Sequence, residues 1–101
     1  MLVYNITIKI VPAIEKEWKY WQQQEHIPEI MATGFFTEYK FYKLLEQDND
    51  DGITYIVQYF SESHDLYNRY IKESAPVFRQ KALDKWGEKF IAFRTVLQVV
   101  N

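Results

Sequence analysis

The stretch "LVYNITIKIVPAIEKEWKYWQQQEH", Leu2–His26, changes its hydrophobic period once, and this change decides the fold. Residues 2–11 are rich in β-branched side chains and alternate, which is typical of a β-strand. After Pro12 the large apolar residues recur at helical spacing, so we expect a helix over about residues 13–26. The chain therefore opens with a strand followed by a helix.

The end of this helix carries a second signal. Ile27 precedes Pro28, and a residue before proline is biased away from the helical region. We therefore expect a kink at this point, with "PEIMATG" forming one or two further turns. Gly34 is expected to end them, because glycine readily takes the left-handed conformation found at helix ends.

The remaining chain predicts two strands, a broken helix and a last strand. The expected strands cover residues 35–46, 53–60 and 89–100, with the turn-forming sequence "QDNDDG" over 47–52 joining the first two. Ser61 or Ser63 is expected to cap a helix over 64–73, and a further helical segment begins at "SAP" and stops at Gly87. We interpret the acidic run Asp48–Asp51 as a solvated hairpin tip, since it lacks the spacing of a calcium loop.

The element order β-α-β-β-α-β is that of a ferredoxin-like α+β fold. Such a fold has a four-stranded antiparallel sheet with both helices on one face, and a chain of 101 residues is expected to form it as a single domain over residues 1–101.

Composition narrows the possible partners. The formal charge of −2 provides no broad positive field, so we do not expect nucleic-acid binding. The absence of cysteine excludes disulfides and thiolate chemistry and favours a cytoplasmic protein. No segment is apolar enough to span a membrane, and the alternating amino-terminal stretch does not read as a signal peptide.

The alternation of the strands predicts which residues face away from the helices. On the first strand Asn5, Thr7 and Lys9 lie opposite the apolar set that begins at Leu2. On the last strand we expect the more apolar set against the helices and the other set on the open face. The apolar set is Ile91, Phe93, Thr95, Leu97 and Val99, and the other set is Phe90, Ala92, Arg94, Val96 and Gln98. The middle strands place Glu38, Lys40, Tyr42, Thr54, Ile56, Gln58 and Phe60 on the same open face.

A sheet face of mixed polarity is suited to pack against the sheet of a second subunit, with a small water-filled cavity between the two sheets. We therefore expect a two-fold homodimer through the open face, with a solvated monomer as the alternative. Aromatic side chains make up 18% of the residues, and they serve either such an interface or the core of a small domain.

The segment "YWQQQEHIPEIMATGFF" resembles the end of the first helix in dimeric α+β barrel proteins, such as the EthD-like and antibiotic-biosynthesis-monooxygenase-like groups. The whole chain is similar to a small bacterial family, a domain of unknown function of that superfamily. The residues that carry this likeness are Tyr4, Asn5, Glu25 to Pro28, Ala32 to Gly34, Thr54 to Tyr59, Ala75 to Leu83 and Phe93 to Thr95. The resemblance implies the fold and the dimer, and it brings no assigned activity.

The resemblance also bears on Asn5. In haem-degrading and cofactor-free monooxygenases of the superfamily, an asparagine on the first strand orients the ligand or dioxygen, which implies such a role for Asn5. Their second partner, a histidine or tryptophan on the second helix, has no obvious match here. We therefore expect neither haem nor any other cofactor.

Two alternative roles remain open for each of three residues. His26 is predicted to act as an acid, a base or a ligand contact, or else to bond the last carbonyls of its helix. Arg94 is predicted to clamp a carboxylate, or else to pair with Glu38. Trp21 is either a core residue or a ligand wall.

Lys9, Tyr42 and Gln58 complete the expected ligand-binding set on the open face, and two histidines alone do not predict a metal site. Two hypotheses follow. The first is a dimer that holds a small anionic or carbonyl-bearing molecule in each cavity, with cofactor-independent acid/base chemistry by His26 and Asn5 if the protein is an enzyme. The second is a non-catalytic binding or assembly module.

Overall fold

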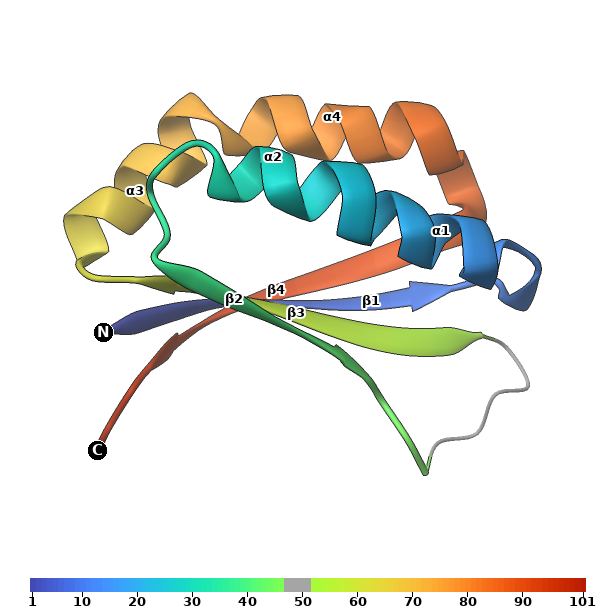
Figure 1. The fold of residues 1–101 in the computed structure, drawn as a ribbon, viewed down its shortest axis with the longest axis horizontal. Helices are drawn as coiled ribbons and strands as arrows, with labels where there is room; N and C mark the ends of the chain where they lie inside the picture. Colours follow the sequence, from blue (N-terminus) through green and yellow to red (C-terminus); the bar gives the residue numbers. More distant parts are fainter. Residues whose placement is uncertain (47–51) are drawn as a thin grey trace.

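The computed structural model describes residues 1–46 and 52–101 and contains one antiparallel sheet. Its strands are β1 (Leu2–Ile10), β2 (Glu38–Lys43), β3 (Ile53–Ser61) and β4 (Phe90–Gln98), in the spatial order β2-β3-β1-β4. All the described helices lie on one face of this sheet, and no part of residues 1–46 or 52–101 forms a layer on the other face (Figure 1). The predicted ferredoxin-like α+β fold is confirmed. The expected turn over 47–52 lies outside the described residues, apart from Gly52.

The helical layer consists of two antiparallel arms. The first arm runs from a short 3-10 turn at Pro12–Ile14 through α1 (Glu15–Trp21), a π-helical segment (Gln22–His26) and α2 (Ile27–Met31). The second arm consists of α3 (His64–Glu73), α4 (Ala75–Trp86) and a 3-10 turn at Gly87–Lys89. None of these helices is long and apolar enough to cross a membrane.

The predicted departure of Ile27 from the helical region is wrong. Ile27 keeps helical dihedral angles, φ −62° and ψ −47°, and its N–H bonds to the carbonyl of Gln22, five residues earlier. In an α-helix a proline loses one hydrogen bond and its ring crowds the carbonyl four residues before it. The wider π turn relieves this crowding without ending the helix.

In the second arm one serine caps the start of α3 and another separates α3 from α4. Ser63 is the N-cap of α3, where its Oγ accepts a hydrogen bond of 3.1 Å from the N–H of Leu66. The other candidate cap, Ser61, instead donates its hydroxyl to the carbonyl of Ser63 at 3.0 Å. Ser74 separates α3 from α4, and Gly87 ends α4 with a φ of 57°, a region that favours glycine.

The core lies between the sheet and the helices. Its strand residues include Tyr4, Ile8, Ile10, Val57 and Tyr59, and its helix residues include Trp18, Ile27 and Ile30. On β1, β2 and β3 the faces agree with the alternation of the sequence, because Tyr4 pairs with Tyr59 while Asn5 pairs with Gln58 on the opposite side.

The predicted orientation of β4 is wrong. Ile6 pairs with Arg94 and Ile8 with Ala92, and directly paired residues point to the same side of a sheet. Arg94 and Gln98 therefore face the helices, and the more apolar set, which includes Phe93, faces away. The expectation assumed that a strand turns its more apolar side toward its own helices, but β4 is an edge strand.

The open face consequently carries exposed apolar side chains along β4. The exposed residues there are Ile91, Phe93 and Leu97, with 58%, 64% and 44% of their surfaces accessible. In Figure 1 the end of β2 and the C-terminal end of the chain both bend away from the helices, so that they border this face on two sides. The open face therefore carries an apolar strip along β4 and is flanked by the end of β2 and by the C-terminal end of the chain.

Candidate ligand-binding pocket

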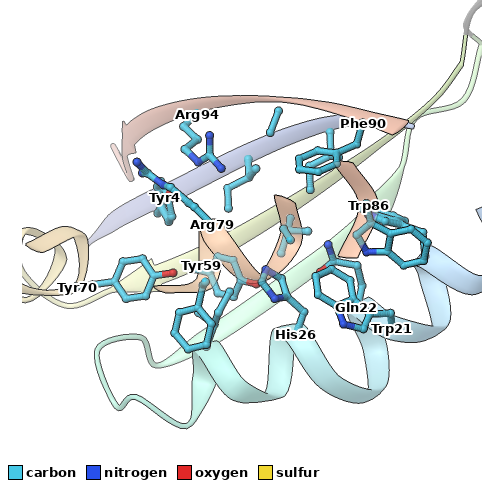
Figure 2. A pocket seen from close by; sticks show the side chains of 18 residues that line it. Tyr4, Trp21, Gln22, His26, Tyr59, Tyr70, Arg79, Trp86, Phe90 and Arg94 are labelled. Atoms are coloured by element: carbon cyan, nitrogen blue, oxygen red, sulfur yellow. The ribbon is translucent and has the colours of Figure 1, made fainter. Parts of the chain in front are cut away.

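A pocket lies between the sheet and the two helical arms. It is open at one end, and its volume is about 40 Å³, which is room for roughly three water molecules. Its walls come from β1, β3, β4, the first helical arm, α3 and α4 (Figure 2). Large aromatic side chains make up much of the wall, namely Trp18, Trp21, Tyr59, Tyr70, Phe78, Trp86 and Phe90.

Two arginines lie at one end of the pocket. Arg79 on α4 and Arg94 on β4 are both exposed, and Figure 2 shows them beside Tyr4. Arg79 Nη2 donates a hydrogen bond of 3.1 Å to Tyr4 Oη. Among residues 1–46 and 52–101 no carboxylate pairs with either guanidinium group. This end of the pocket is therefore positively charged and has no counter-ion from the described chain.

Two buried tyrosines stand close to the arginines. Burial raises the pKa of Tyr59 and of Tyr70 above the usual value, and the neighbouring tyrosines raise both further. Arg79 and Arg94 oppose this change at Tyr70. Both phenols are therefore neutral at physiological pH, and they add no negative charge that would cancel the arginines.

His26 packs into the aromatic wall. Its ring stacks on Trp21 at a centroid distance of 4.3 Å and meets the edge of Phe78 at 5.9 Å. Burial lowers the pKa of His26 to about 4, with Glu29 opposing the change and Lys81 adding to it. The imidazole is therefore neutral at pH 7, where it can accept or donate a hydrogen bond but carries no extra proton to give away.

Three polar atoms of the pocket residues lack partners. Gln22 Oε1, His26 Nδ1 and Trp86 Nε1 are buried, and none has a hydrogen bond from the part of the chain that the structure describes. Trp21 contacts two of these residues, since it stacks on His26 and meets Trp86 edge-on at 5.8 Å. Because buried polar groups are normally satisfied, this end of the pocket is a polar site within an aromatic wall.

The structure divides the predicted site residues into two groups. Trp21, His26 and Arg94 line the pocket, whereas Asn5, Lys9, Tyr42 and Gln58 lie on the other face of the sheet. Asn5 Oδ1 accepts a hydrogen bond of 3.2 Å from Gln58 Nε2, and Asn5 Nδ2 donates one of 3.4 Å to Thr7 Oγ1. The expectation that His26, Asn5 and Arg94 share one cavity is therefore wrong.

The alternative pairing of Arg94 with Glu38 is not formed within the chain. β2 and β4 are the two edges of the sheet, and Glu38, paired with Phe60, lies on the open face while Arg94 faces the helices. An intrasubunit bridge would have to cross the whole sheet.

Sequence reasoning did not place several of the lining residues in the site, and Gln22, Arg79 and Trp86 are the polar ones among them that matter most. Arg79 and Trp86 are seven residues apart on α4, a spacing that places both on one side of a helix and that would have brought Arg79 into the site. Gln22 carried no signal of its own, because its inward direction depends on the π-helical segment. Within the described ranges no group of three or more histidine, aspartate or glutamate side chains lies together as a metal site would require.

Comparison with protein families shows to which family the chain belongs. Residues 1–100 match the Domain of unknown function (DUF4286), and the protein belongs to this family. The family resemblance expected from "EHIP" and the other segments is confirmed. A comparison with curated protein sequences finds no match.

Solved structures share the fold over nearly the full chain. An ethyl tert-butyl ether degradation (EthD) family protein from Bacillus halodurans has a TM-score of 0.69 at 11% identity, covering 99% of this chain and 100% of that one. SnoaB from Streptomyces nogalater, a cofactor-independent oxygenase, has a TM-score of 0.68 at 14% identity, covering 99% and 94%. A dimeric ferredoxin-like protein from an uncultured marine organism has a TM-score of 0.63 at 15% identity, covering 100% and 96%. At these identities the likeness shows the fold alone.

Proposed function

We propose that this protein binds a small organic acid in the pocket between its helices and its sheet. The observation that supports this most is the pair of arginines, Arg79 and Arg94, which stand without carboxylate partners from the described chain beside an aromatic cavity. A guanidinium group binds a carboxylate through two parallel hydrogen bonds, and this geometry favours a carboxylate over a neutral ligand.

The size of the cavity limits how such a ligand sits. A volume of about 40 Å³ admits only a few heavy atoms, so the carboxylate stays at the open end beside the arginines. The aromatic walls contact the few apolar atoms of the ligand that enter the cavity.

Binding is favoured over proton transfer. A general base works best when its pKa lies near the working pH, and burial lowers the pKa of His26 to about 4. SnoaB is a cofactor-independent oxygenase on the same fold, but a likeness of 14% identity brings no reaction to this chain. We therefore assign His26 a hydrogen-bonding role in the pocket.

A thermal-shift titration tests the binding proposal. Phenylacetate and benzoate should raise the melting temperature, and their neutral amides should not. Arg94→Ala and Arg79→Ala should each weaken the effect of the acids by about tenfold or more, because a hydrogen bond to a charged group contributes about 1.5–3 kcal/mol. Arg69→Ala is the matched control, since Arg69 is exposed on α3 and pairs with Glu73.

Equal stabilisation by the acids and the amides would contradict the proposal. So would acid binding that is the same in the wild type and in both pocket variants.

We further propose that two copies of the chain associate through their open sheet faces. The apolar side of β4 lies there with Phe93 64% exposed, and large exposed apolar patches mark interaction sites. A two-fold axis would bury the same strip of both copies, and the dimeric ferredoxin-like relative shows that this fold occurs as a dimer.

A dimer that binds no small molecule is the second candidate function. The observation that favours it is the Asn5–Gln58 hydrogen bond, which satisfies polar groups of the open face within one chain. On that account the polar open-face residues serve only the subunit contact. The acid titration separates the two candidates, because a pure assembly module would not respond to phenylacetate.

A further inference from the structure

We propose that the inner end of the pocket is a hydroxyl-binding subsite, formed by Gln22, His26 and Trp86. The ligand is then an aromatic acid with a hydroxyl group at the end of the ring opposite the carboxylate. This inference rests on the proposed function, since the arginines hold the other end of the same molecule.

The hydrogen-bonding capacity of the three unpartnered atoms indicates which chemical group of a ligand fits between them. Trp86 Nε1–H can only donate a hydrogen bond, and Gln22 Oε1 can only accept one. A hydroxyl group does both, and the neutral imidazole of His26 can take either part. A carboxylate at this end would instead meet the Gln22 oxygen without a proton to offer.

Burial makes this arrangement costly without a ligand. Gln22 is 3% exposed and Trp86 is 7% exposed, so these atoms are closed to bulk water, and only a ligand or a water held in the pocket can bond to them. The π-helical segment Gln22–His26, a rare conformation that occurs frequently at functional sites, contributes two of the three groups. In Figure 2 Gln22 appears between His26 and Trp86, at some distance from Arg94 and Tyr4.

The spacing between Arg79 and Trp86 along α4 determines how long the bound ligand has to be. Arg79 and Trp86 are seven residues apart, which places their Cα atoms roughly 10 Å apart along the helix axis. The Arg79 side chain points toward Tyr4, away from Trp86 (Figure 2), so a six-membered ring with a substituent and a hydrogen bond at each end is needed to join the two ends of the pocket. The volume of about 40 Å³ then holds the hydroxyl end of the ring.

Three probes test the subsite by isothermal titration calorimetry: phenylacetate, 4-hydroxyphenylacetate and 4-methylphenol. The wild type should bind 4-hydroxyphenylacetate about tenfold or more tightly than phenylacetate, because the hydroxyl satisfies groups that otherwise stay unpaired. Gln22→Met removes one partner and keeps a similar shape, whereas Trp86→Phe removes the other partner together with one ring of the indole. Both should bring the ratio close to one.

Gln22→Met has a second readout that does not depend on a ligand. Because Gln22→Met removes a buried polar atom without a partner and keeps the volume, this unliganded variant should melt a few degrees higher than the wild type, whereas Trp86→Phe also leaves a cavity and is read by its binding ratio alone. A residue with a purely structural role would lower the melting temperature when it is replaced.

The three probes distinguish a failure of the hydroxyl subsite from a failure of the proposed anion site. Arg94→Ala should weaken both acids equally and leave 4-methylphenol unchanged, whereas Gln22→Met should weaken 4-methylphenol. If the acids bind through the arginines with no preference for the hydroxyl, the subsite is refuted and the proposed function stands. If only 4-methylphenol binds, the anion site is refuted and the subsite stands. Binding of none of the three refutes both.

Discussion

The buried imidazole of His26 makes the stability of this protein depend on pH. An unfolded histidine has a pKa of about 6.5, and burial lowers the pKa of His26 in the folded chain to about 4. Between these values the unfolded chain binds more protons than the folded one, so acid favours unfolding. The contribution of His26 is fully present above pH 6.5 and is lost as the pH falls toward 4.

The size of the effect follows from the two pKa values. At about 1.4 kcal/mol for each tenfold change in proton affinity, the full difference corresponds to about 3 kcal/mol. This is a large part of the 5–15 kcal/mol that is typical of a whole domain. The unfolding transition should therefore move visibly over a range in which most other side chains keep their charge.

Urea unfolding, followed by tryptophan fluorescence at half-unit steps from pH 7.5 to 4, measures this effect. The variant His26→Gln removes the titrating group and keeps a polar side chain. The difference in unfolding free energy between wild type and variant should fall by about 3 kcal/mol across the range, since the carboxylates titrate alike in both. His64→Gln is the control, because the exposed His64 is the other histidine of the chain.

A difference between wild type and His26→Gln that stays constant from pH 7.5 to 4 would refute the reasoning. It would mean that His26 titrates in the folded chain as it does in water, and that the aromatic wall does not exclude solvent from the ring.

The remaining predictions concern the interface, a helix end and the core. Phe93→Asp should convert a dimer into a species with the mass of one chain in light scattering, whereas Leu83→Asp, on the exposed side of α4, should leave the dimer intact; a monomeric wild type at micromolar concentration would contradict this. Gly87→Ala should cost about 1 kcal/mol in urea unfolding, because Gly87 has a φ of 57° and a Cβ there would meet no atom within 4 Å; an unchanged stability would mean that the helix end does not need this conformation. Ile27→Ala should cost about 2–5 kcal/mol, since Ile27 is 1% exposed, and a loss below 1 kcal/mol would show that this site is not part of the core.

The sequence predicted most of the fold because its local signals agree with the tertiary structure. The change of period after Pro12 and the alternation of β1 follow from burial on one side, as the pairing of Tyr4 with Tyr59 confirms. β4 departed from this rule because its more apolar side, with Phe93, faces away from the helices. A pattern of alternation gives the two sides of a strand, but it does not say which side meets the helices when a second surface also favours apolar residues.

The candidate site was predicted less well, for two physical reasons. The error in β4 placed Arg94 beside Asn5, although the sheet separates these residues. The bias of the residue before Pro28 predicted that Ile27 leaves the helical region, whereas the π-helical segment keeps Ile27 helical, and Gln22 lines the pocket. His26 and Trp21 were recognised because the histidine, the proline and the tryptophan lie together in one short segment.

The location of the binding site can be measured directly with side-chain nitrogen signals. In a ¹H–¹⁵N spectrum with 4-hydroxyphenylacetate added in steps, the indole signal of Trp86 and the side-chain amide of Gln22 should shift, while the amides of Asn5 and Gln58 stay in place. Shifts at Asn5 and Gln58 with Trp86 unmoved would place the ligand on the open face of the sheet and contradict a site beneath the helices.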